Sequence, residues 1–265
     1  MNRINAFLEK LWQNYSAGNS QAQKIKSLIE MTEAQVFTDH IALRTFNDKR
    51  VCLERFVQIF RQFGYRLREE YSFEAKKLNA VYLEHSSASY PKIFISELVL
   101  EKFSQDLQSR VKEALNYLHH HKHLGPEFVY SGRPWPVISY EEYKLIREES
   151  EYAAWLMCFG FCVNHFTVAV HRTNKFASIE QVNDFLKSHG FELNSSGGEV
   201  KGRPEQGLVQ SSTLAEKVCF GFKDHEEWIP FCYYEFAYRY ELDDELFGGF
   251  IPSSADKIFE STDHR

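Results

Sequence analysis

The chain has 265 residues, of which 43% are hydrophobic and 26% charged, with a formal net charge of −6. This composition is typical of a folded globular protein and excludes a disordered or collagen-like chain. The acidic balance argues against a nucleic-acid-binding protein, which needs a basic surface to neutralise phosphates. No apolar run approaches the roughly 18 residues of a membrane-spanning helix, and the N-terminal segment has charges within its apolar pattern and no cleavage site. We therefore expect a cytoplasmic protein whose five cysteines are reduced thiols.

Helical periodicity occupies residues 1–35, where Ile4, Phe7 and Leu11 recur at spacings of three and four. The period then changes to two, and residues 36–100 have the pattern of one β-α-β-β-β module. Its expected elements are a strand over 36–46, a helix over 52–63 that stops at Gly64, and strands from Tyr65, Leu78 and Lys92.

Residues 101–160 again have helical spacing, for example at Leu107, Val111 and Leu115, and we interpret them as a helical insertion. The first pattern then returns over 161–241 as a second β-α-β-β-β module, and 242–265 remain as a C-terminal closing segment. The elements expected in the second module are a strand over 164–171, a helix over 178–190, and strands over 191–194, 207–216 and 232–240. An internal repeat of this kind predicts a single α+β domain with two half-sheets curved around a cavity.

Strand alternation places one metal-competent side chain on a face of each of three predicted strands. These side chains are His40, His165 and Glu235, and the next residues on the same faces are Ala42, Thr167 and Ala237. Small neighbours leave space for a ligand where a packed core would have Leu or Phe. Two histidines and one carboxylate form the facial triad of non-haem Fe(II) sites with open coordination positions, although this pattern does not distinguish iron from other divalent ions. The alternative is that each histidine is a hydrogen-bonded core or surface residue.

Arg44 follows His40 by four residues on the same face, so we expect its guanidinium in the same cavity. There it would pair with a ligand carboxylate or with an internal Asp or Glu. Arg239 has the same spacing from Glu235, and we expect it to reach solvent or to orient that carboxylate. Glu97 is assigned the place in the first module that Glu235 holds in the second. It is either a fourth ligand or a structural residue, and we favour the second role.

Other motifs of catalysis and phosphate binding are missing from the sequence. It contains no G-x-S-x-G nucleophile motif, no Walker P-loop and no H-E-x-x-H metal motif. The histidine-rich run HHHKH at 119–123 lies at a predicted helix end, where we expect a solvated helix terminus rather than a metal site.

Four motifs in combination resemble the 2-oxoadipate dioxygenase/decarboxylase family of the vicinal oxygen chelate, or glyoxalase-like, superfamily. They are DHIALRT around His40, NHFTV around His165, YYEFAYR around Glu235 and the closing SADKIFEST. The resemblance runs from about residue 36 to the end of the chain and implies two glyoxalase-like β-α-β-β-β modules around a metal cavity. It also implies that His40, His165 and Glu235 hold Fe(II) and that Arg44 binds a substrate carboxylate.

The activity that this resemblance implies is an Fe(II)-dependent conversion of a small 2-oxo dicarboxylic acid, 2-oxoadipate, by dioxygen to 2-hydroxyglutarate and CO2. His40, Arg44 and His165 would then also contact the substrate, and Ser254 would bind it from a segment that closes the pocket. Two alternatives remain open. One is a non-oxidative metal-dependent lyase or isomerase of the same superfamily, which a fourth ligand at Glu97 would favour. The other is a metal-free ligand-binding module.

Overall fold

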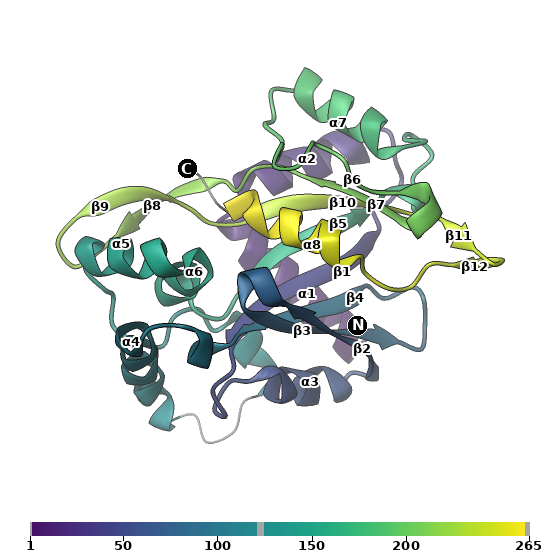
Figure 1. The fold of residues 1–265 in the computed structure, drawn as a ribbon. Helices are drawn as coiled ribbons and strands as arrows, with labels where there is room; N and C mark the ends of the chain where they lie inside the picture. The colour runs from purple at the N-terminus through teal and green to yellow at the C-terminus, as the bar shows by residue number, and fades with distance from the viewer. Residues whose placement is uncertain (1, 121–124, 263–265) are drawn as a thin grey trace.

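One continuous eight-stranded sheet is the centre of the computed structural model, which describes residues 2–120 and 125–262 (Figure 1). Its strand order is β2-β3-β4-β1-β5-β10-β7-β6, and two hairpins, β8-β9 and β11-β12, stand apart from it. The strands are β1 (Thr38–Phe46), β2 (Tyr65–Phe73), β3 (Leu78–His85), β4 (Lys92–Leu98), β5 (Val163–Ala169), β6 (Lys201–Arg203), β7 (Leu208–Ser212), β8 (Lys217–Gly221), β9 (Glu226–Pro230), β10 (Tyr233–Arg239), β11 (Glu241–Leu242) and β12 (Glu245–Leu246).

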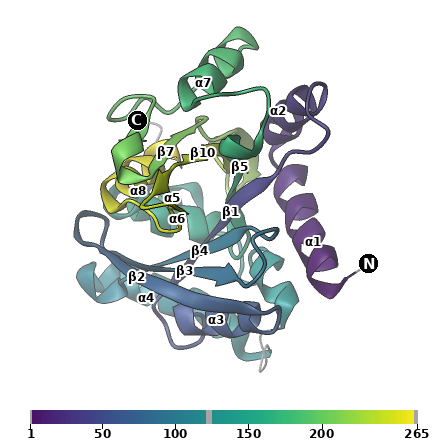
Figure 2. The ribbon, with the colours of Figure 1, turned by 90° about the vertical axis from the view of Figure 1, so that its right-hand side faces the viewer.

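The helices cover both sides of this sheet. They are α1 (Arg3–Ala17), α2 (Ser20–Glu30), α3 (Leu53–Arg61), α4 (Gln105–Asn116), α5 (Tyr140–Glu149), α6 (Glu151–Phe159), α7 (Ile179–Ser188) and α8 (Pro252–Phe259). Helices α1 and α2 lie on one side (Figure 2). There Trp12 of α1 meets Phe166 of β5 edge to face at 5.1 Å. Helices α5, α6 and α8 lie on the other side. None of the helices in the described residues is both long and apolar enough to cross a bilayer.

Two halves with the same order of elements meet in the middle of the sheet. The first half runs β1-α3-β2-β3-β4 with β1 parallel to β4, and the second runs β5-α7-β6-β7-β10 with β5 parallel to β10. The halves join where β1 pairs antiparallel with β5, with Ala42 opposite His165. The predicted helix of the second half begins after Ser178, whose side chain caps Gln181 N, and its chain turns at Gly190 with a φ of +80°.

The sequence prediction was wrong for one strand of the second half. Residues 191–194 form only a single bridge, between Leu193 and Thr213, and the strand that follows α7 is β6. Two consecutive glycines with positive φ, Gly197 and Gly198, turn the chain before β6 begins. The β8-β9 hairpin was not predicted. Of the histidine-rich run at 119–123, residues 121–123 lie outside the described residues.

Candidate metal and substrate site

Three neighbouring strands bring His40, His165 and Glu235 to one point on the inner face of the sheet. Nε2 of His40 lies 3.4 Å from Glu235 Oε1, and Nε2 of His165 lies 3.1 Å from Glu235 Oε2. One ligand atom from each residue lies within 4.8 Å of the other two, and all three side chains are buried. The structure therefore brings together the three residues that the sequence singled out as ligands.

The protonation of these groups suits a cation. Burial lowers the pKa of His165, in spite of the nearby carboxylate, so its imidazole stays neutral at neutral pH. Burial alone would raise the pKa of Glu235, but His165 and His40 outweigh this effect and lower it, so the carboxylate is ionised. Two imidazole nitrogens and one carboxylate form a donor set that fits a divalent ion with further coordination positions open.

Each histidine is oriented by the residue immediately before it. His40 Nδ1 lies 2.8 Å from Asp39 Oδ1, and His165 Nδ1 lies 3.0 Å from Asn164 Oδ1. With the hydrogen on Nδ1, each ring donates to its neighbour and presents the lone pair of Nε2 toward Glu235. The two halves of the protein therefore use the same device, with a carboxylate in one half and an amide in the other.

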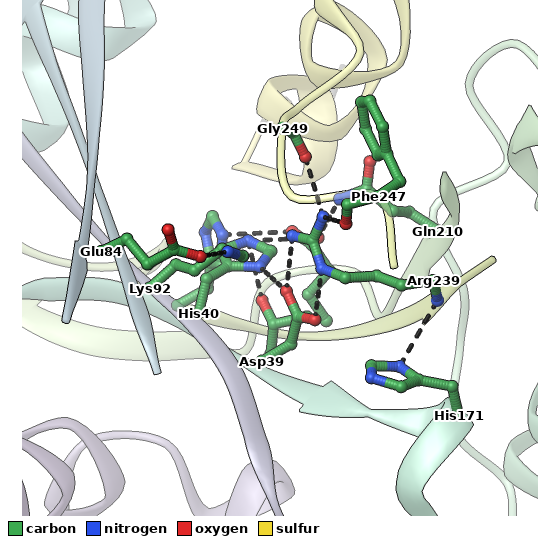
Figure 3. A network of polar contacts seen from close by, with 12 residues as sticks. Asp39, His40, Glu84, Lys92, His171, Gln210, Arg239, Phe247 and Gly249 are labelled. Carbon is green, nitrogen blue, oxygen red and sulfur yellow. Dashed lines mark hydrogen bonds and ion pairs between the residues drawn. The ribbon is translucent and has the colours of Figure 1, made fainter. Parts of the chain in front are cut away.

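Arg239 does not reach solvent or bond Glu235, so both expectations for it were wrong. Its guanidinium is buried and donates to Asp39 from Nε at 2.7 Å and from Nη2 at 2.9 Å (Figure 3). Nη1 donates to the carbonyl oxygens of Phe247 and Gly249 at 3.0 and 2.8 Å. Burial would raise the pKa of Asp39, but Arg239 and the His40 hydrogen bond lower it far below its ordinary value. Arg239 thus holds an ionised carboxylate behind His40.

Gln210 completes the surroundings of the triad from β7. Its Nε2 donates to Glu235 Oε1, whereas His165 contacts the other oxygen of that carboxylate. On the His40 side, the Thr167 hydroxyl lies 3.0 Å from Nε2. The hydrogen bond from the neutral Gln210 amide fixes the position of the carboxylate without neutralising its charge.

Arg44 lies on the inner face, as predicted, and has unused hydrogen-bonding capacity. Nη2 donates to Thr262 Oγ1 at 3.2 Å, and the guanidinium lies over the rings of Tyr152 and Trp155 at 4.9 and 5.1 Å. Its Nε and Nη1 are buried without an acceptor, and within residues 2–120 and 125–262 no carboxylate forms an ion pair with it. The same side chain lines a hollow of about 720 Å³ that Tyr152 and Thr262 also line. A buried guanidinium with unpaired N–H groups at the wall of a hollow is suited to bind an anionic ligand.

Glu97 does not hold the place of Glu235 in the first half. In the second half Glu235 pairs with Thr167, two residues after His165, and the matching pair in the first half is Ala42 with Phe94. Glu97 pairs with Thr45, on the opposite face from His40, and its Oε2 accepts a hydrogen bond from Leu53 N at 2.9 Å, at the start of α3. The place of a fourth ligand is therefore occupied by a phenylalanine ring, and Glu97 has the structural role that we favoured.

Ser254 lies in α8 and does not line the hollow that Arg44 lines. It is buried, and a Cβ added at Gly202 would lie 3.4 Å from its Oγ. With Gly202 and Lys201 it lines a different hollow, of about 650 Å³. Its role in substrate binding stays a prediction. In the described part of the C-terminal segment, Thr262 accepts a hydrogen bond from Arg44, and Phe259 also lines the hollow beside it.

Comparison with known proteins decides the family. The model of the family described as 2-oxoadipate dioxygenase/decarboxylase matches residues 6–126 and 126–246. A curated rice (Oryza sativa) protein named 2-oxoadipate dioxygenase/decarboxylase, chloroplastic/amyloplastic, is 34% identical over 94% of this chain and 75% of its own length. The chain belongs to the 2-oxoadipate dioxygenase/decarboxylase family. The resemblance stated from the four sequence motifs is thereby confirmed.

Solved structures agree with this assignment. A crystal structure of hydroxyglutarate synthase from Oryza sativa, in complex with 2-oxoadipate, superposes with a TM-score of 0.92 at 32% identity and covers 98% of this chain and 91% of that one. A Shewanella frigidimarina protein with a provisional hydrolase description has a TM-score of 0.90 at 43% identity, with coverage of 95% and 99%. A glyoxalase-superfamily protein from Ralstonia eutropha shares the fold, with a TM-score of 0.75 at 20% identity over 92% of this chain and 84% of its own. The predicted glyoxalase-like α+β fold is therefore confirmed.

Several residues of the site in this family member were not identified from the sequence. Asp39 and Asn164 carried a usable signal, because each precedes a candidate ligand at the same place in the two modules. No pattern in the sequence pointed to Gln210. Its contact with Glu235 depends on the antiparallel register of β7 and β10, in which Gln210 lies opposite Ala237.

Proposed function

We propose that this protein is an Fe(II)-dependent dioxygenase that decarboxylates a small 2-oxo dicarboxylic acid, 2-oxoadipate, to 2-hydroxyglutarate. The observation that carries the proposal is a buried triad of two histidines and one carboxylate whose fourth-ligand place is occupied by Phe94. A ligand set of this kind leaves positions for both a chelating substrate and dioxygen. The names of the rice relatives, one of them in complex with 2-oxoadipate, supply the substrate.

The reaction balances without a second oxidisable acid. 2-Oxoadipate and O2 yield 2-hydroxyglutarate and CO2, with one oxygen atom of O2 entering the new carboxylate and the other the hydroxyl group. Fe(II) held by His40, His165 and Glu235 would activate dioxygen and polarise the 2-oxo acid when bound.

The chain's own residues position the reactants. Asp39 and Asn164 keep both imidazoles in the tautomer that binds a cation, and Gln210 holds the Glu235 carboxylate. Arg44 pairs with the carboxylate at the far end of the substrate, so that the acid is fixed at two points. Phe94 and Phe250, whose rings lie 4.9 Å apart, keep water from one side of the site.

The test is metal analysis of anaerobically purified protein, followed by oxygen uptake and CO2 release with 2-oxoadipate. We expect one iron per chain and equal consumption of oxygen and acid. Turnover without oxygen would instead indicate the non-oxidative lyase or isomerase, and a chain that retains no metal would indicate a binding module. We also propose a cytoplasmic location, on the sequence alone. The two curated plant relatives differ in this respect, since both are named as plastid proteins.

A further inference from the structure

Tyr233 is a buried residue of the triad face to which the proposed reaction assigns no role. It opens β10 two residues before Glu235, so both side chains project from the same face of the strand. In the parallel ladder of β10 and β5 it lies opposite His165, and its ring stacks on that imidazole with centroids 4.5 Å apart and planes at 27°. The Tyr233 ring therefore lies directly against a predicted metal ligand.

The hydroxyl of Tyr233 is buried and has no hydrogen-bond partner in the described part of the chain. Three other buried tyrosines of this protein donate to backbone carbonyls. Tyr15 donates to Tyr233 O at 2.5 Å, Tyr65 to Pro91 O at 2.9 Å and Tyr152 to Ser96 O at 2.7 Å. A buried hydroxyl without a partner costs about 1–3 kcal/mol, so its presence requires an explanation.

Two further unpaired donors on this face belong to Arg44, whose Nε and Nη1 have no acceptor among the described residues. The Tyr233 phenol carries a hydrogen at neutral pH and can therefore donate, as the Arg44 guanidinium can. Arg44 follows His40 by four residues on β1 and Tyr233 lies opposite His165, so both donors project from the triad face of the sheet. Unpaired donors of this kind on one face are complementary to a ligand that carries several oxygen atoms.

We propose that the Tyr233 hydroxyl donates a hydrogen bond to an oxygen atom of the 2-oxo acid end of the substrate, while Arg44 pairs with its distant carboxylate. This inference rests on the proposed function and adds a residue that contacts the substrate. It follows from the position of Tyr233 against His165, at the end of the substrate that would chelate the ion.

The test is Tyr233→Phe, which removes one oxygen atom and keeps the ring on His165. Binding of 2-oxoadipate is measured by calorimetry on zinc-loaded full-length protein, in which no oxygen chemistry competes, and thermal unfolding is followed in parallel. A lost hydrogen bond to a charged acceptor predicts a Kd about tenfold or more higher, with zinc content unchanged. Because the hydroxyl is unpaired in the free protein, the unfolding midpoint should stay the same or rise.

The matched control is Tyr65→Phe, which removes a hydroxyl that does have a partner. This variant should lower the unfolding midpoint by about 2–4 °C and leave the Kd unchanged. The proposal is overturned if Tyr233→Phe leaves the Kd unchanged, or if it lowers the midpoint as Tyr65→Phe does. Wild-type protein that binds no 2-oxoadipate would also overturn it. Tight binding without oxygen uptake would refute the proposed reaction and leave the Tyr233 contact standing.

Discussion

Replacing Asp39 by asparagine tests the buried ion pair behind His40. Both partners are almost fully buried, with side-chain exposures of 3% for Asp39 and 2% for Arg239. Breaking such a pair costs about 3–5 kcal/mol, because the remaining charge is left uncompensated. Arg239 keeps its hydrogen bonds to the carbonyl oxygens of Phe247 and Gly249, so we expect a loss near the lower end, about 3 kcal/mol in the free energy of unfolding.

Metal affinity should respond separately from stability. In Asp39→Asn the new side-chain amide can still accept a hydrogen bond from His40 Nδ1, as Asn164 does at His165, so the orientation of the ring is kept while the charge is lost. Removing a partner of a metal-binding histidine typically weakens affinity about 10–100-fold, and retention of the hydrogen bond predicts about tenfold here. Zinc affinity is measured by competition with a chelator, and stability by chemical denaturation of the metal-free protein.

Asp48→Asn is the control, because Asp48 also pairs with an arginine, Arg50, but with exposures of 15% and 26%. It should cost less than about 1 kcal/mol and leave zinc affinity unchanged. An Asp39→Asn protein as stable as Asp48→Asn, or one with wild-type zinc affinity, would refute the role assigned to the Asp39–Arg239 pair.

The remaining predictions concern the triad, the anion site and one buried lysine. His165→Ala should lose bound metal, whereas Arg44→Ala should keep the metal and raise the Kd for 2-oxoadipate about 100-fold. Metal analysis and calorimetry distinguish the two variants. Equal loss of metal in both would contradict the roles assigned to these residues. Phe94→Glu should increase metal retention and abolish oxygen uptake by supplying a fourth ligand, with circular dichroism as the check on folding; unchanged uptake would show that this place does not face the ion. Burial lowers the pKa of Lys201 to about 8, whereas the pKa of a lysine in the unfolded chain is about 10.4. Between these values the unfolded chain binds one more proton than the folded chain. The free energy of unfolding should therefore rise by up to ~1.4 kcal/mol per pH unit over this range. Lys201→Met should remove this rise in denaturation curves taken from about pH 7.5 to 10, and an unchanged slope would assign the rise to other groups.

The repeat of strand and helix patterns was enough to predict the fold, because each half alternates its periodicity in the same order. The prediction failed where residues with a strand-like pattern do not pair with the sheet. Residues 191–194 have strand-like composition, yet Gly197 and Gly198 turn the chain, and β6 forms after them. The β8-β9 hairpin packs outside the main sheet, so the count of strands in the repeat gave no reason to expect it.

For the site, alternation along single strands was sufficient to identify His40, His165 and Glu235 and to place Arg44 on their face. Glu97 was misplaced because equivalence between the halves depends on the ladder partner, and a shift of one residue reverses the face. The partner of Arg239 could not be predicted either. Asp39 lies 200 residues earlier in the chain, and the two meet only through the order of β1, β5 and β10.

The antiparallel seam between β1 and β5 divides the triad unequally. His40 comes from one half of the sheet, and His165 and Glu235 come from the other. Neither half supplies all three candidate ligands. An ion bound by the triad would therefore crosslink the two halves, and its binding would stabilise the folded chain against unfolding. We therefore expect removal of the ion to lower the free energy of unfolding of the whole chain, which denaturation with and without a chelator would measure.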